Sequence, residues 1–136
     1  MARIVVIDDD ADLRRYVQFH LEKAEHDVFC ARDGFEGIEL VEELRPDLII
    51  LDVMMPGLDG VEICKRLKYH DEITRIPVIF LTAKADPGGR LRGLESGGDK
   101  YITKPFKMAE LSAQIDALLA RTPPAHTSSV EPPVAT

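Results

Sequence analysis

Short apolar segments rich in Val and Ile recur along the chain at regular intervals. They occupy residues 3–8, 27–31, 48–52, 77–82 and 99–102. Apolar residues follow one another almost without interruption in these segments, which is typical of strands that are covered on both faces. The pattern therefore predicts five buried strands in a parallel sheet.

Between these segments, apolar residues recur at helical spacing. The helical stripes are Leu13, Tyr16, Val17, Leu21 and Ala24; Ile38, Val41 and Leu44; Val61, Cys64 and Leu67; Leu91 and Leu94; and Leu111, Ile115, Leu118 and Leu119. An alternation of strand and helix indicates βα units joined by right-handed crossovers. We therefore predict an α/β fold with helices on both faces of the sheet.

Turn-forming and capping residues mark the ends of these elements. Asp10 or Asp12 can cap the first helix, and Pro46 ends the second because the residue before a proline avoids helical angles. Asp59-Gly60 belongs to the turn before the third helix. Asp86–Gly89 is expected to open a fourth helix, which its two glycines weaken by about 1 kcal/mol each relative to alanine.

Length and charge narrow the class of protein. A chain of 136 residues suits one domain, and its net charge of -7 argues against direct binding of this domain to nucleic acid. We see no signal peptide and no apolar stretch of the roughly 20 residues that span a bilayer. Cys30 and Cys64 lack the spacing of a disulfide framework or a metal site, so we expect a cytoplasmic protein with reduced thiols.

The composition changes after Arg121. Residues 122–136 contain four prolines and no helical stripe. Such a segment is either a linker or a disordered tail. We therefore expect one domain over residues 1–121, followed by a Pro-rich segment that leads to an output domain or frays.

Reactive and charged residues stand where the predicted strands end. These residues are Asp8, Asp9, Asp52, Thr82 and Lys104. Ligands of an open parallel sheet bind outside the carboxyl ends of its strands, so these side chains are expected to share one crevice. Two carboxylates about 4 Å apart repel by roughly 4 kcal/mol at an effective dielectric constant near 20. Three of them require a cation, and oxygen ligands without His or Cys favour Mg²⁺, with Mn²⁺ as a substitute.

A carboxylate can also act as the nucleophile toward phosphorus and form an aspartyl phosphate. We assign this role to Asp52, because it ends the most apolar segment and therefore lies on a central strand. Asp8 and Asp9 are then the metal pair. Thr82 can donate a hydrogen bond to a phosphoryl oxygen, and Lys104 can pair with another.

Four motifs in this order resemble those of bacterial two-component response-regulator receiver domains. They are Val6–Asp10, Leu51–Gly60, Leu81–Lys84 and Tyr101–Phe106. The resemblance covers residues 2–121 and implies a flavodoxin-like, doubly wound, five-stranded parallel sheet of strand order 2-1-3-4-5. It also implies a phosphoacceptor in a phosphorelay and not a turnover enzyme, although such a domain assists its own phosphorylation and dephosphorylation.

The resemblance also implies partners. A sensor histidine kinase or a histidine phosphotransfer protein would supply the phosphoryl group to Asp52. Phosphorylation would then switch the face formed by the fourth helix, the fifth strand and the fifth helix. An output domain after the linker, and a homodimer formed through the fourth and fifth helices, are further partners to expect.

Roles for individual site residues follow from the same resemblance. Asp9, Asp52 and the backbone carbonyl of Met54 would bind Mg²⁺, and Asp8 would hold a metal-bound water. Lys104 would contact the acyl phosphate, and its peptide bond to Pro105 would be cis.

A switch pair is implied as well. Thr82 would turn its hydroxyl toward the phosphoryl group while the ring of Tyr101 moves inward. Such a pair is a two-state element biased by new charge-assisted hydrogen bonds.

Three alternatives remain open from the residues alone. A metal-dependent hydrolase with an aspartyl-phosphate intermediate would need a further acid two residues after Asp52, where Met54 stands. A receiver-like interaction module that is not phosphorylated would lack an acid or the lysine. A flavin-binding domain would need a hydroxyl- and glycine-rich loop after the first strand, where this chain has three aspartates.

Overall fold

The sheet of this protein has five parallel strands, as the apolar pattern predicts, in the order β2-β1-β3-β4-β5 that the family resemblance implies. The computed structural model describes residues 1–69, 72–83 and 97–121. Its elements are β1 (Arg3–Ile7), α1 (Ala11–Lys23), β2 (Asp27–Ala31), α2 (Gly34–Leu44), β3 (Leu48–Asp52), α3 (Gly60–Leu67), the short 3-10 helix η1 (Ile73–Arg75), β4 (Val78–Ala83), β5 (Lys100–Lys104) and α5 (Met108–Arg121). The predicted fourth helix and the segment 122–136 lie outside the described residues.

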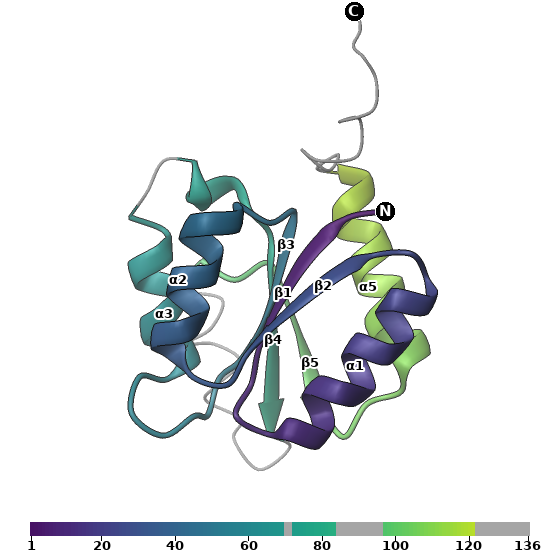
Figure 1. Cartoon of the computed structure of the whole chain (residues 1–136), viewed down its shortest axis with the longest axis horizontal. Helices are drawn as coiled ribbons and strands as arrows, with labels where there is room; N and C mark the ends of the chain where they lie inside the picture. Colours follow the sequence, from purple (N-terminus) through teal and green to yellow (C-terminus); the bar gives the residue numbers. More distant parts are fainter. Residues whose placement is uncertain (70–71, 84–96, 122–136) are drawn as a thin grey trace, which may run out of the picture.

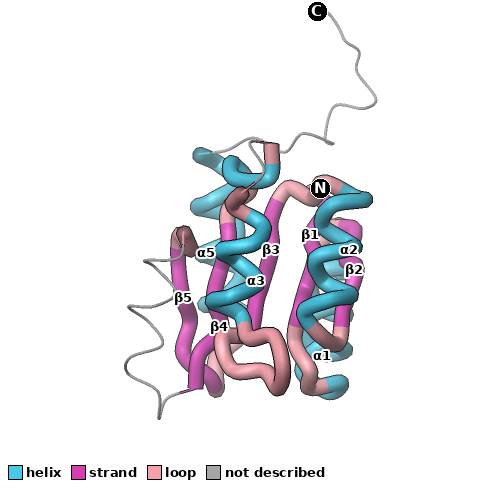
Figure 2. The backbone as a smooth tube through the Cα atoms, turned by 90° about the vertical axis from the view of Figure 1, so that its left-hand side faces the viewer, coloured by secondary structure: helices cyan, strands magenta, loops and turns pink. Residues whose placement is uncertain are grey.

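Helices cover both faces of this sheet (Figure 1). Helices α2 and α3 lie on one side, and α1 and α5 lie on the other. Figure 2 shows the strands running side by side, with loops at both ends of the sheet. No helix among the residues placed by the structure is long and apolar enough to cross a membrane.

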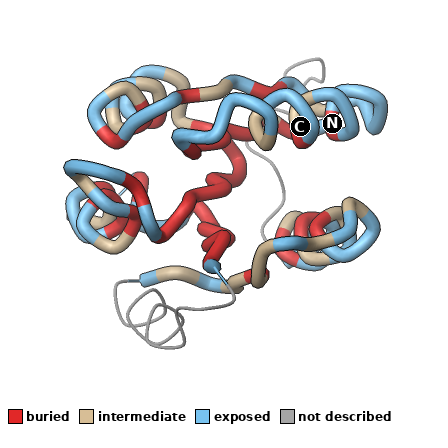
Figure 3. Tube along the Cα trace, turned by 90° about the horizontal axis from the view of Figure 1, so that it is seen from below, coloured by how far each residue is buried: buried red, intermediate tan, exposed pale blue. Residues whose placement is uncertain are grey.

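Alternate residues of each inner strand enter two separate cores. Val5 and Ile49 pack toward α2 and α3, whereas Ile4 and Leu48 pack toward α1 and α5. All four of these side chains are completely buried. Successive strand residues point to opposite faces, so a strand covered on both faces is apolar throughout. This explains the nearly continuous apolar segments, which form the buried central layer of Figure 3.

Carboxylate caps begin the first three helices. Asp10 accepts hydrogen bonds from the backbone N–H groups of Asp12 and Leu13, so Asp10 is the cap of α1. Asp33 and Asp59 cap α2 and α3 in the same way. Each cap satisfies a donor that the first turn of a helix leaves unpaired.

Strand β5 extends further than its apolar pattern indicates. Its apolar segment ends at Ile102, but the strand continues to Lys104 because Thr103 and Lys104 pair with the last two residues of β4. Backbone pairing does not depend on side-chain polarity, so hydropathy alone does not reveal this extension. The extension carries the Lys104 side chain to the edge of the sheet at which β1 and β3 also end.

Candidate functional site

Three carboxylates meet at the carboxyl edge of the sheet, which is the lower edge in Figure 1. Asp8 and Asp9 directly follow β1, and Asp52 is the last residue of β3. Because β1 and β3 are neighbours in the sheet, these residues come together although they are far apart in sequence. One oxygen from each carboxylate lies within 4.8 Å of the others.

Lys104 bridges two of these carboxylates from the end of β5. Its Nζ lies 3.0 Å from Oδ2 of Asp8 and 3.3 Å from Oδ2 of Asp52. The Asp8 side chain is fully buried and that of Asp52 is 6% exposed, whereas Asp9 is exposed. Burial strengthens this attraction, because charges removed from water are weakly screened.

The electrostatics of the cluster raise the pKa of Asp52 to about 6. Burial is the largest cause, followed by repulsion from Asp8; attraction and hydrogen bonding from Lys104 and a backbone hydrogen bond from Met54 act in the opposite direction. Burial lowers the pKa of Lys104, but its hydrogen bond to Asp8 and its attraction to both carboxylates outweigh that effect and raise it. The pKa of Asp52 therefore lies above its ordinary value, and a further positive charge beside the carboxylate would lower it.

Backbone donors fix the orientation of the two buried carboxylates. The N–H of Met54 donates to Oδ1 of Asp52 at 3.1 Å, and the N–H of Asp10 donates to Oδ1 of Asp8 at 2.9 Å. Each buried carboxylate therefore has a main-chain donor on one oxygen and Lys104 on the other. Such bonds restrict rotation of the nucleophile that the sequence predicts.

Gly60 brings the start of α3 against the end of β3. Its N–H donates to the carbonyl oxygen of Val53 at 3.0 Å. A Cβ atom at this position would lie 2.1 Å from the carbonyl oxygen of Asp52. Only glycine allows this close approach, so Gly60 helps to hold the loop that follows Asp52.

The predicted switch residues lie beside this cluster but do not enter it. Thr82 is buried, and its hydroxyl contacts the carbonyl oxygen of Ala83 at 3.5 Å. Tyr101 is half-buried and packs against the core that lies beneath α2 and α3. Within the described ranges, the Thr82 hydroxyl makes no hydrogen bond to the three acids.

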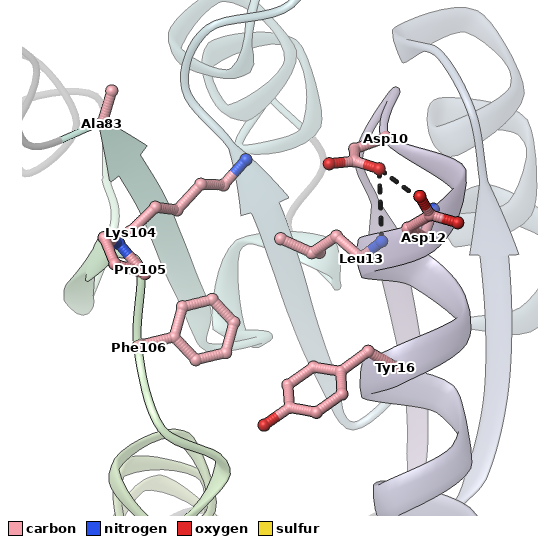
Figure 4. A pocket seen from close by; sticks show the side chains of 8 residues that line it. All are labelled: Asp10, Asp12, Leu13, Tyr16, Ala83, Lys104, Pro105 and Phe106. Atoms are coloured by element: carbon pink, nitrogen blue, oxygen red, sulfur yellow. Dashed lines mark hydrogen bonds between the residues drawn. The ribbon is translucent and has the colours of Figure 1, made fainter.

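A cleft opens on the α1 side of Lys104 (Figure 4). Its volume is about 460 Å³, and its walls are Asp10, Asp12, Leu13, Tyr16, Ala83, Lys104, Pro105 and Phe106. The Tyr16 and Phe106 rings approach each other from opposite walls. The Lys104–Pro105 peptide bond in the second wall is cis, the isomer that the resemblance implies. The cleft thus combines an apolar interior with acidic residues at its rim.

The donor set of this edge fits a hard divalent cation. Asp8, Asp9 and Asp52 offer only oxygen ligands. Three carboxylates against the one ammonium of Lys104 leave two negative charges, which a divalent ion would balance. Oxygen-only ligands of this kind suit Mg²⁺ or Mn²⁺.

One residue that holds this site was missed by sequence reasoning. Arg14 of α1 donates from Nη1 to the carbonyl oxygen of Asp8 at 2.8 Å. An arginine in a helix is ordinarily a solvated surface charge, so its type alone gives no signal. Its position within two helical turns of the predicted acidic loop was the one sequence signal that it could contact that loop.

Comparison with known proteins gives the class of this fold and site. The family model of the response regulator receiver domain matches residues 4–116, so the chain belongs to this family. It is a module of two-component signal transduction and not a turnover enzyme.

Particular relatives extend the comparison. The chain is 44% identical over 122 residues to the DNA-binding dual master transcriptional regulator RpaA of Synechocystis. The aligned region covers 90% of this chain and 51% of that protein. It thus spans about half the length of this curated relative. Among solved structures, it resembles the Francisella response regulator 1452 receiver domain, with 34% identity, a TM-score of 0.82 and coverage of 90% and 99% of the two chains. It also resembles the signal receiver domain of a signal transduction histidine kinase from Syntrophus aciditrophicus, with 34% identity, a TM-score of 0.83 and coverage of 98% and 100%.

Proposed function

We propose that this domain accepts a phosphoryl group on Asp52 from a phosphohistidine of a sensor histidine kinase or a histidine phosphotransfer protein. The observation that carries the proposal is the pairing of a buried, oriented Asp52 carboxylate with Lys104 and two further acids at the sheet edge. Membership of the receiver family supports the same chemistry. The alternative hydrolase is disfavoured because Met54 stands where a further acid would be needed.

The reaction exchanges one bond to phosphorus for another. An oxygen of Asp52 forms the new P–O bond while the P–N bond of the phosphohistidine breaks, and the bonding electron pair returns to the imidazole. Lys104 stabilises the negative charge on the transferred group, and the N–H of Met54 keeps the carboxylate oriented. Such transfers depend mainly on positioning and charge stabilisation.

Mg²⁺ is the cofactor that this chemistry requires, with Mn²⁺ as a substitute. We propose that Asp9, Asp52 and the backbone carbonyl of Met54 hold the ion and that Asp8 binds it through a water. The three carboxylates carry more negative charge than the single ammonium group of Lys104 balances, and this supports a divalent ion at the site. When bound, the ion neutralises charge on the phosphoryl oxygens.

The cleft beside Lys104 is the surface on which we propose that the phosphohistidine donor docks. One wall of the cleft is Lys104, whose Nζ lies 3.3 Å from Asp52, and its apolar interior offers area that a protein partner can bury. The acidic rim formed by Asp10 and Asp12 would favour a partner with basic residues around its histidine.

Phosphorylation would then be transmitted through Thr82 and Tyr101. The contact of the Thr82 hydroxyl with the Ala83 carbonyl is long, at 3.5 Å, so we propose that a phosphoryl oxygen would replace it with a stronger bond. Tyr101 would move further inward and change the face that includes β5. We propose an output domain as the recipient, since the Synechocystis relative is a DNA-binding regulator of about twice this length. A homodimer through α5 and the predicted fourth helix remains a proposal.

Labelling with a small phosphodonor tests the function. The protein is incubated with acetyl phosphate and Mg²⁺, and intact mass spectrometry measures the addition of one phosphoryl group. Asp52→Asn should abolish the addition, and removal of Mg²⁺ by a chelator should do the same in the unaltered chain. Asp10→Asn is the matched control, because it removes a neighbouring acid but preserves the helix cap.

The possible results separate the alternatives. Continued labelling of Asp52→Asn would assign the nucleophile to another residue. No labelling of the unaltered protein by acetyl phosphate or by any phosphohistidine donor would favour an interaction module that is not phosphorylated.

A further inference from the structure

Asp9 is an exposed carboxylate in a short loop, and its orientation depends on the two peptide groups that flank it. The peptide before Asp9 includes the carbonyl of Asp8, which accepts from Nη1 of Arg14 at 2.8 Å. The peptide after Asp9 includes the N–H of Asp10, which donates to Oδ1 of Asp8 at 2.9 Å. Both peptide groups are therefore held by side chains.

Arg14 fixes this loop at a second point as well. Its backbone N–H donates to the carbonyl oxygen of Asp10 at 3.0 Å. The Asp8 and Asp10 carbonyls, on either side of Asp9, are thus both bound to Arg14. The backbone bond belongs to α1 and would survive any substitution, whereas the bond to Asp8 depends on the arginine side chain.

We infer that Arg14 is a positioning residue, which orients the Asp9 carboxylate for metal binding by holding the Asp8–Asp9 peptide group. This inference rests on the proposed function, because the ion is the Mg²⁺ proposed there. Arg14 contacts neither the ion nor the phosphoryl group in this role. The Asp8 backbone N–H is already bound to the carbonyl oxygen of Ala31 at 3.1 Å, so loss of Arg14 would release only the carbonyl end of the residue.

Charge and positioning predict opposite effects on metal affinity, and this makes the role testable. If Arg14 acted only as a nearby cation, its removal would reduce repulsion and tighten the binding of Mg²⁺. If it positions Asp9, its removal frees the peptide group and weakens binding. Loss of an outer partner of a metal ligand typically weakens metal affinity by about 10-fold or more.

Metal affinity is measured by calorimetric titration with Mg²⁺ and by the electron paramagnetic resonance signal of free Mn²⁺. Arg14→Met should bind each ion about 10-fold more weakly than the unaltered protein. Arg14→Lys keeps a donor and a charge, so it should recover most of the affinity. Arg15→Met is the matched control: it removes the same charge from the next residue, whose guanidinium pairs with exposed Asp12.

The outcomes distinguish this inference from the function on which it rests. Binding by Arg14→Met that equals or exceeds that of the unaltered protein would overturn the positioning role. An equal loss in Arg15→Met would also overturn it, because the effect would then not depend on the contact between Arg14 and the Asp8 carbonyl. Failure of the unaltered protein to bind either ion would overturn the proposed metal site itself, and with it this inference. Circular dichroism of each metal-free variant confirms that the affinities compare folded proteins.

Discussion

Neutralising Asp52, the proposed nucleophile, should stabilise the metal-free protein. At neutral pH the fold must hold Asp52 ionised although its pKa is raised from 3.8 to about 6. A difference of about 2 pKa units corresponds to about 3 kcal/mol. Asp52→Asn removes that cost and weakens the hydrogen bonds from Lys104 and Met54 by about 1 kcal/mol. We therefore expect the free energy of unfolding to rise by about 2 kcal/mol.

The assay is urea unfolding in the presence of a chelator, followed by circular dichroism. With a slope of about 1–3 kcal/mol per molar urea, the gain should raise the midpoint by about 1 M. Asp47→Asn is the control, since Asp47 is also buried but accepts a hydrogen bond from the N–H of Arg3 at 2.8 Å. This control should lose about 1 kcal/mol, because it weakens a hydrogen bond to a charged acceptor.

The pH dependence gives a second test of the same reasoning. Because the folded pKa of Asp52 exceeds its unfolded value, the native state binds more protons between about pH 4 and pH 6. This contribution to stability is present below that window and is lost as the pH rises through it. Asp52→Asn should lack this loss, and Mg²⁺ should stabilise the unaltered protein more than the variant. A variant that is less stable than the unaltered protein at neutral pH without metal would refute the reasoning.

Two further predictions concern the backbone. Gly60→Ala should lower the free energy of unfolding by at least about 3 kcal/mol in urea titrations, since its Cβ would lie 2.1 Å from the Asp52 carbonyl oxygen. Gly57→Ala has open space around its Cβ but a φ of +80°, so it should lose only about 1 kcal/mol; equal losses would contradict the close-contact explanation. Glu25 has a φ of 70°, so Glu25→Gly should raise the thermal midpoint through a gain of about 1 kcal/mol, and an unchanged or lower midpoint would contradict this.

The parallel sheet and the convergence of the acids could be predicted from periodic and local signals, whereas the strand order came from the family resemblance. Continuous apolar segments such as Leu48–Asp52 indicate a buried parallel strand, and parallel strands place their carboxyl ends at one edge. The positions of Asp8, Asp52 and Lys104 at this edge follow directly from that rule.

Contacts that depend on exact distances could not be predicted. Gly60 reads in the sequence as a turn residue, and only the coordinates show its contact with the Asp52 carbonyl. Arg14 resembles any helical surface arginine until its reach to Asp8 is measured.

The ion pair between Asp8 and Lys104 joins residues 96 positions apart, and Asp52 comes from a third strand between them. A chain that is truncated, partly synthesised or misfolded would bring these groups to no common point. Such a molecule could neither collect the charge needed for an ion nor present an activated carboxylate to a donor. The acidic site therefore forms only when β1, β3 and β5 are all in place, and the proposed phosphorylation of Asp52 would depend on a completed sheet.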